Sequence, residues 1–147
     1  MKIAFLMAVA FIATVAPVTA ETVDGNRIIV LDGDTVALPC ASPAHGCAEK
    51  IRLLDIDAPE TFRPDCADGL KAGLKAKARL AELIRGRAIF VQRFNNQRDR
   101  YGRTLAALRI GGPAGMSIGM QLVREELALP YINGQKEERR LFWCGPK

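Results

Sequence analysis

The sequence is poor in the residues from which most structural metal clusters are built. It has one histidine, His45, and none of its four cysteines belongs to a CxxC pair. Structural zinc sites need several such ligands at short spacing, so we do not expect a histidine or cysteine metal cluster. The chain also has no internal repeat and no low-complexity tract. We therefore expect one compact unit rather than a repeat array.

The apolar run at the N-terminus is too short for a transmembrane helix. It extends from Ile3 to Ala13, whereas a helix that spans a bilayer needs ~20 apolar residues. Lys2 precedes the run, and the segment ends in the small residues Val18-Thr19-Ala20, as secretory signals do. We predict a signal peptide at residues 1–20, with a membrane anchor as the alternative. The mature protein is then exported, either periplasmic or extracellular, and keeps no membrane anchor.

The mature chain, residues 21–147, is long enough for a single small domain. Only Lys2 of the 21 Lys and Arg residues lies in the signal peptide, and all 16 Asp and Glu residues lie outside it, which leaves a formal charge of +4. A basic surface suits a polyanionic partner, but many basic domains use their charge only for solubility. The net charge by itself therefore identifies no partner.

All four cysteines lie in the mature chain, and an even number after an export signal indicates two disulfides. Four cysteines allow three pairings. Cys40 and Cys47 flank the turn-forming stretch ASPAHG, so we favour a disulfide between them. Cys66 and Cys144 would then tie the end of the chain to its middle.

Hydrophobic patterning predicts five strands interrupted by a helix. The first two strands lie within residues 26–38 and meet at the turn-forming pair Asp32-Gly33. The third runs over about residues 49–56. The last two, at residues 88–94 and 104–110, are joined by the polar loop NNQRDRYG.

Three helices are expected beside these strands. An amphipathic helix spans residues 67–85, with Leu70 and Leu74 on its apolar face and Gly86 at its end. A second helix begins after the N-cap Ser117 and continues to about Ala128, and a short charged helix covers residues 135–142. The fold class is mainly β with α (α+β), and we predict an all-antiparallel small barrel with helices packed outside it.

Three short motifs carry candidate chemistry. The first, Asp32-Gly33-Asp34-Thr35, places two carboxylates at a strand turn. Hard cations such as calcium take oxygen ligands of this kind, although Asp-Gly is also a common hairpin turn.

The second motif is IRLLDIDAPE, in which Arg52 interrupts an apolar strand and acidic residues cluster where that strand ends. A buried arginine needs an anionic partner or a solvent cleft. A structural ion pair explains the pattern as well as a functional site does. Alternation along a strand puts Arg52 and Asp57 on opposite faces, so a shared site requires a twist, bulge or turn between them.

The third motif is DRYGR in the loop between the last two strands, which contains Asp99, Arg100, Tyr101 and Arg103. A guanidinium can grip phosphate oxygens, and an aromatic ring can stack on a base. Basic loops are also common as solvated surface.

In this order, DGDT, RLLxIDAPE and DRYGR resemble the staphylococcal nuclease (thermonuclease) family over nearly all of residues 23–142. The resemblance implies a five-stranded OB-fold β-barrel with three peripheral helices. It implies a calcium-dependent nuclease, with DNA or RNA as substrate and with 3′-phosphate products. We expect a monomer.

The resemblance also implies site residues. Asp34 and Asp57 would bind Ca²⁺ together with the backbone carbonyl of Ala58. Arg52, Glu60 and Arg103 would be the catalytic residues, and Tyr101 would bind substrate.

Several features depart from the family pattern, among them Ala58 in place of a hydroxyl residue and the four cysteines. Asp55 stands where many members have a small or apolar residue, and it would tune metal affinity or face solvent. Tyr131 lies near the place of a substrate-contacting tyrosine, but Pro130 disturbs the register, so we give Tyr131 no site role and favour core packing for it.

Two other functions remain open at this stage. An OB-fold module could bind nucleic acid without cutting it, although such domains typically lose charged catalytic positions. A secreted structural domain could use the same acids and arginines as ion pairs.

Overall fold

The computed structural model describes residues 19–39, 48–54 and 56–146. The strands are β1 Thr19–Asp24, β2 Ile29–Asp32, β3 Thr35–Pro39, β4 Ala48–Leu53, β5 Ile56–Asp57, β6 Ala88–Arg98, β7 Thr104–Ile110, β8 Met116–Ser117 and β9 Leu129–Pro130. The helices are α1 Ala67–Ile84, α2 Ile118–Arg124 and α3 Lys136–Cys144, and a single 3-10 turn, η1, spans Gly25–Arg27. None of the helices in these ranges is long and apolar enough to cross a membrane.

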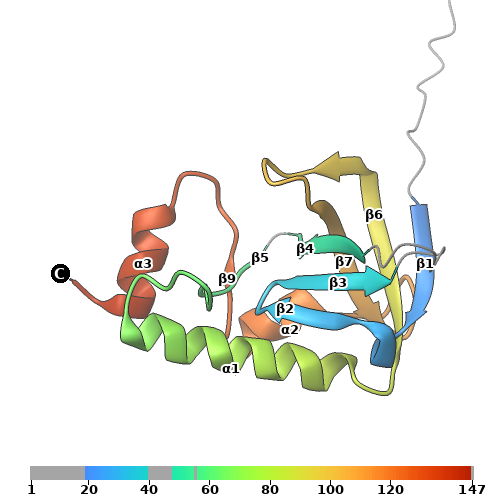
Figure 1. The fold of residues 1–147 in the computed structure, drawn as a ribbon, viewed down its shortest axis with the longest axis horizontal. Helices are drawn as coiled ribbons and strands as arrows, with labels where there is room; N and C mark the ends of the chain where they lie inside the picture. Colours follow the sequence, from blue (N-terminus) through green and yellow to red (C-terminus); the bar gives the residue numbers. More distant parts are fainter. Residues whose placement is uncertain (1–18, 40–47, 55, 147) are drawn as a thin grey trace, which may run out of the picture.

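The large sheet has the strand order β1-β6-β7-β4-β3-β2, with β8 added to β7, and β5 and β9 form a separate two-stranded ladder. Figure 1 shows α1 running along one side of the sheet and α3 standing at the end away from β1. The three helices and the large sheet confirm the α+β class. The expectation of an all-antiparallel sheet was wrong, because β4 and β7 pair in parallel. Between these two strands the chain passes through β5, α1 and β6.

The two ends of the strand order, β1 and β2, are consecutive in the sequence and separated only by η1. The described residues contain no β1–β2 ladder, so the hydrogen-bonded sheet is open at this point. Gly25 allows η1 to lie directly on the end of α1, because a Cβ there would stand 2.1 Å from the Ile84 carbonyl oxygen. Strand β1 was not predicted, since its residues adjoin the expected leader and carry no clear strand pattern.

The core is aliphatic and lies between the sheet and the helices. Its fully buried large side chains are Ile51, Ile56, Leu80, Ile84, Ile89, Leu108, Ile118, Leu122, Val36 and Val91. The predicted apolar face of α1 was partly wrong, because Leu74 is 52% exposed. The buried stripe instead begins with Gly69, Gly73 and Ala76. These small residues let α1 approach the segment after β5: a Cβ on Gly73 would lie 2.5 Å from the Pro59 carbonyl oxygen.

The ends of the helices follow the predicted signals in part. Ser117 is the N-cap of α2 and accepts a hydrogen bond from the Met120 amide. Gly86 follows α1 with a φ of +69°. Helix α2 is shorter than predicted and ends at Arg124, because Glu126 adopts a φ of +57° that a helix cannot continue.

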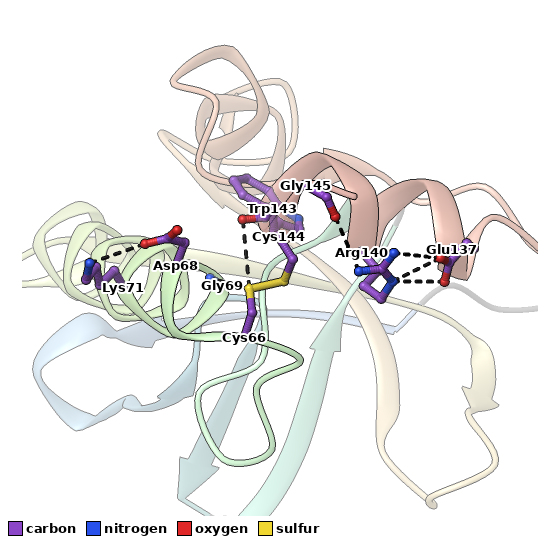
Figure 2. Close-up of a disulfide and its surroundings, with 9 residues drawn as sticks. All are labelled: Cys66, Asp68, Gly69, Lys71, Glu137, Arg140, Trp143, Cys144 and Gly145. Atoms are coloured by element: carbon purple, nitrogen blue, oxygen red, sulfur yellow. Dashed lines mark hydrogen bonds and ion pairs between the residues drawn. A yellow bond between two sulfur atoms is a disulfide. The ribbon is translucent and has the colours of Figure 1, made fainter. Parts of the chain in front are cut away.

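A disulfide joins Cys66 to Cys144, as predicted (Figure 2). Cys66 is also the N-cap of α1, and its Sγ accepts a hydrogen bond from the Gly69 amide at 3.1 Å. The proposed partners Cys40 and Cys47 lie outside the described residues, as do Asp55 and residues 1–18 of the predicted signal peptide. Strand β1 begins at Thr19, so cleavage after Ala20 would leave Glu21–Asp24 of this strand.

Candidate functional site

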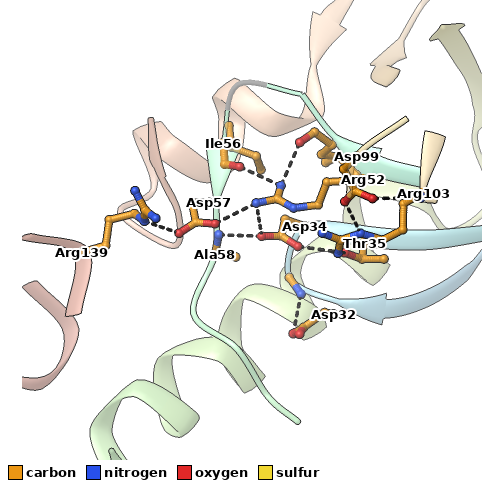
Figure 3. A network of polar contacts seen from close by, with 12 residues as sticks. Asp32, Asp34, Thr35, Arg52, Ile56, Asp57, Ala58, Asp99, Arg103 and Arg139 are labelled. Atoms are coloured by element: carbon orange, nitrogen blue, oxygen red, sulfur yellow. Dashed lines mark hydrogen bonds and ion pairs between the residues drawn. The ribbon is translucent and has the colours of Figure 1, made fainter. Parts of the chain in front are cut away.

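Arg52 is the centre of the polar network shown in Figure 3. It projects from β4, between β3 and β7, and is only 9% exposed. The chain turns after β4, and this turn brings Asp57 of β5 back to the guanidinium. Nη1 of Arg52 donates to the carbonyls of Leu53 and Ile56 at 2.9 and 2.7 Å. Nη2 contacts Asp57 Oδ1 at 2.7 Å and Asp34 Oδ2 at 3.0 Å. Arg52 and Asp57 therefore share one site, as the family resemblance required.

Asp34 occupies the tight turn between β2 and β3 and is buried behind Arg52. Its Oδ1 accepts a hydrogen bond from Thr35 Oγ1 at 2.9 Å, and its Oδ2 accepts one from the Ala58 amide at 2.9 Å. Burial raises the pKa of Asp34, while Arg52 and these two donors oppose the rise. Gly33 makes this packing possible, because a Cβ there would stand 2.7 Å from Ala58 Cβ.

Arg103 reaches the same network from the start of β7. Its Nε donates to Asp99 Oδ2 at 2.6 Å, and its Nη1 donates to Thr35 Oγ1 at 3.1 Å. Thr35 in turn donates to Asp34, so a chain of hydrogen bonds joins the DRYGR loop to the DGDT turn. Burial acts to raise the pKa of Asp99, but hydrogen bonds from the backbone and side chain of Arg103 outweigh it and lower this pKa.

Glu60 follows the buried Pro59 and is exposed. Desolvation of its carboxyl raises its pKa, and the charges of Asp32, Asp34 and Asp57 raise it further, while Arg103 acts against them. Among the described residues, none donates a hydrogen bond to the Glu60 carboxylate. Both carboxylate oxygens therefore remain available to a water molecule or a ligand.

These residues meet in an open cleft with a volume of about 1100 Å³. Arg52, Asp57, Ala58, Glu60, Tyr101 and Arg103 all line it, whereas Asp34 lies beneath the surface. Seven arginine and lysine side chains and four carboxylates form its walls and floor. The cleft is thus a basic surface with an acidic patch at its floor, a combination suited to a phosphate group and a cation together.

Two tyrosines of the cleft extend or correct the interpretation of the sequence. Tyr101, proposed to bind substrate, is 67% exposed, and the guanidinium carbons of Arg100 and Arg103 lie 4.8 and 5.4 Å from its ring centre. Core packing, which the sequence favoured for Tyr131, was wrong, because this residue lines the cleft and is 48% exposed. It follows the two-residue strand β9, which pairs with β5 and carries the chain to this position.

Arg139 was missed in the sequence and takes part in the network. Its Nε lies 2.5 Å from Asp57 Oδ2, and its Nη1 donates to the Ile132 carbonyl at 3.2 Å. No local pattern distinguishes this residue from the other charged residues of α3. Only the packing of α3 against the cleft brings it to Asp57.

The donors at the floor fit a hard cation in their chemistry. Asp34, Asp57 and the Ala58 carbonyl are oxygen donors, the type that calcium prefers. The mutual repulsion among the carboxylates that raises the pKa of Glu60 is what a divalent cation would relieve. Over the described residues, however, no group of three or more His, Cys, Asp or Glu side chains is arranged to hold a metal ion. Arginines already contact the two aspartates in this arrangement, so a cation would have to compete with Arg52 and Arg139.

Comparison with known proteins identifies the family. The family model for staphylococcal nuclease homologues matches residues 50–142. The chain belongs to this family. The resemblance based on the three motifs is thereby confirmed. In this nuclease homologue the matched region contains most of β4, all elements from β5 to β9, and most of α3.

Curated relatives of this nuclease homologue are named as nucleases. An uncharacterized endonuclease of Escherichia coli O157:H7 is 33% identical over 115 residues, which cover 78% of this chain and 65% of the relative. Endonuclease YhcR of Bacillus subtilis (strain 168) is 34% identical over 123 residues, 80% of this chain and 10% of the relative. Micrococcal nuclease of Shigella flexneri is 33% identical over 113 residues, 73% of this chain and 58% of the relative. The chain thus spans less than two thirds of the length of these relatives.

Proposed function

We propose that this protein is a calcium-dependent nuclease that hydrolyses phosphodiester bonds of DNA, RNA or both. The observation that carries the proposal is the convergence of Arg52, Arg103 and Glu60 on one basic cleft, beside Asp57 and above Asp34. These residues come from segments far apart in the sequence. The names of the relatives point to the same reaction.

The two arginines are poised differently to bind a phosphate. Of the five N–H groups of Arg52, three donate hydrogen bonds to protein acceptors, and Nη2 also lies 3.0 Å from Asp34 Oδ2. Phosphate binding by Arg52 therefore uses Nε–H or requires the release of one carboxylate. Arg103 donates from Nε to Asp99 and from Nη1 to Thr35. Its Nη2 donates to none of the described residues, so it can bind a non-bridging phosphate oxygen. Both guanidinium groups would bind more strongly as negative charge builds on the phosphorus oxygens.

Glu60 would orient or deprotonate the attacking water. Its raised pKa makes it a stronger base than an ordinary surface glutamate. Arg103 lies close enough to influence this pKa, so the base and a phosphate-binding group act on the same small region. Attack by the water on phosphorus and departure of the 5′-oxygen of the next nucleotide would leave a 3′-phosphate.

Asp34, Asp57 and the Ala58 carbonyl are the residues that would hold calcium. The bound ion would supply Lewis-acid polarisation of the scissile phosphate and would offset the charge of the transition state. Arg52 contacts both aspartates and Arg139 contacts Asp57, so calcium binding would have to loosen these ion pairs.

We further propose that the protein acts as a monomer after export to the periplasm or the medium. The support for export is the signal-like N-terminus and the Cys66–Cys144 disulfide, because disulfides persist in oxidising compartments.

The test is to incubate the purified protein with single-stranded DNA, once with calcium and once with chelator. The proposal expects cleavage with calcium only, and products whose ends carry a 3′-phosphate. Binding without cleavage under both conditions would support a non-catalytic OB-fold module instead. Neither binding nor cleavage would support a structural domain.

A further inference from the structure

Helix α3 is attached to the rest of the protein by a disulfide and an ion pair rather than by a buried face. None of its residues is buried, and a helix of this length is marginal in water by itself. At its C-terminal end Cys144 is bonded to Cys66 (Figure 2), and near its middle Arg139 is paired with Asp57 at the cleft floor (Figure 3). These two links fix which face of α3 meets the cleft.

The face that meets the cleft is basic. Lys136, Arg140 and Trp143 all line it, and their spacing of four and three residues puts them on one side of a helix. Lys136 is exposed and forms no ion pair with the described residues. Arg140 lines the cleft and is positioned by hydrogen bonds from Nε and Nη2 to Glu137 and from Nη1 to the Gly145 carbonyl, with its side chain 13% exposed.

A second basic wall faces this one. The β6–β7 loop contributes the exposed side chains of Arg100 and Tyr101 to the same cleft. Figure 1 shows this loop and α3 rising on either side of β5, the strand that carries Asp57. A polyanion that lies across the cleft floor would therefore meet cations on both sides of the candidate reaction centre.

We infer that α3 is a disulfide-fastened wall of a single-strand nucleic-acid groove, in which Lys136 and Arg140 bind the phosphates that flank the scissile one. This inference rests on the proposed function and extends it to substrate length. A single strand fits because Tyr101 and Tyr131 line the groove beside the cations, and stacking platforms within a basic groove are how proteins bind single strands.

Two charge-removal variants test the wall. Binding of a fluorescent single-stranded oligodeoxynucleotide of about 12 nucleotides is measured by anisotropy in chelator, at several salt concentrations. We expect Lys136→Gln and Arg140→Gln each to raise Kd about 3- to 10-fold. Each should also reduce the steepness of log K against log salt concentration by about 0.7, the value for one lost phosphate contact on a single strand.

Lys77→Gln is the matched control. It removes the same charge from α1, where Lys77 lines a separate hollow between α1 and β2, and it should leave Kd and the salt dependence unchanged. A salt dependence in Lys136→Gln and Arg140→Gln equal to that of the wild type would overturn the inference. So would an equal change in Lys77→Gln.

The paired variant Cys66→Ala/Cys144→Ala tests the fastening. If far-UV circular dichroism shows a folded protein, we expect its salt dependence to fall by about 1.4, as for the loss of both phosphate contacts. Wild-type binding by this folded variant would overturn the role of the disulfide. If the variant does not fold, the two charge-removal variants decide the inference alone.

The inference and the proposed function fail in different experiments. Absence of cleavage with calcium, together with the expected salt effects in chelator, would reject the nuclease and keep the wall. Cleavage with calcium, together with unchanged salt effects, would keep the nuclease and reject the wall.

Discussion

Replacement of Arg52 by Met should destabilise the protein strongly, because it leaves two buried or half-buried carboxylates without their shared cation. Arg52 and Asp34 have side-chain exposures of 11% and 9%, and Asp57 has 27%. Charged hydrogen bonds contribute roughly 1.5–3 kcal/mol each, and Arg52 makes three, besides its ion-pair contact with Asp34. Their sum overestimates the loss, since the buried guanidinium has already lost its hydration. We expect the free energy of unfolding to fall by about 3–5 kcal/mol, as for other broken buried pairs.

A double-mutant cycle with Asp34→Asn separates the charge pair from other effects of the substitution. In Asp34→Asn, Arg52 keeps Asp57 and both carbonyl acceptors, so its cost should be smaller, about 1–3 kcal/mol. In the double variant the buried aspartate no longer stands without its cation. The two changes should therefore be less than additive, with a coupling energy of about 1–3 kcal/mol.

The assay is urea unfolding followed by circular dichroism in chelator, so that no cation compensates for the missing arginine. Arg52→Lys is the control, because lysine keeps the charge but cannot reach four acceptors with one planar group; it should be intermediate. A cost below about 1 kcal/mol for Arg52→Met would refute the reasoning. Strict additivity in the cycle would refute it as well.

Three further outcomes are expected. Hydrogen bonds from Arg93 lower the pKa of Glu49, although desolvation of its carboxyl acts to raise it. The ionised Glu49 therefore stabilises the fold above its unfolded pKa, and this stabilisation is lost as the pH falls through the folded pKa. In urea unfolding, Glu49→Gln should be less stable than the wild type near neutral pH and equally stable in strong acid. Cys66→Ala/Cys144→Ala opens a loop with a sequence separation of 78, for which chain entropy gives about 4.5 kcal/mol. Guanidinium unfolding should show a smaller loss of unfolding free energy than this, because α3 has no buried residues and can fray in the folded state. An unchanged unfolding free energy would contradict this prediction. Arg103→Lys should lower the cleavage rate by about 10²–10³ and lower the melting temperature only modestly, since lysine keeps the positive charge beside Asp99.

Local signals predicted most of the strands and helices and the order of the candidate residues. The Asp-Gly turn, the apolar strands and the N-cap Ser117 are features that neighbouring residues determine. Strand β1 was not predicted, because Thr19–Asp24 becomes a strand only by pairing with β6. The face of α1 was misjudged because Gly73 and Ala76 are buried through close backbone approach. Their hydrophobicity did not predict this.

The site was predictable where the chain brings its residues together locally and not where packing does so. The sequence required a turn between Arg52 and Asp57, and that turn is present after β4. The contact between Arg139 and Asp57 depends on where α3 docks, which the disulfide and the cleft determine. Tyr131 likewise reaches the cleft through the β5–β9 ladder, whose two-residue strands carry almost no sequence signal.

Nuclease chemistry in this cleft is decided by the rate of single-stranded DNA cleavage with calcium in Glu60→Gln, with oligonucleotide affinity measured on the same sample. Glu126→Gln, an exposed change at the end of α2 that lies outside the cleft lining, is the control. We expect Glu60→Gln to lower the rate by about 10²–10⁴ while affinity and stability stay near wild type, and we expect the control to be fully active. Wild-type cleavage by Glu60→Gln, or no cleavage by the wild-type protein itself, would rule out a nuclease in which Glu60 acts on the attacking water.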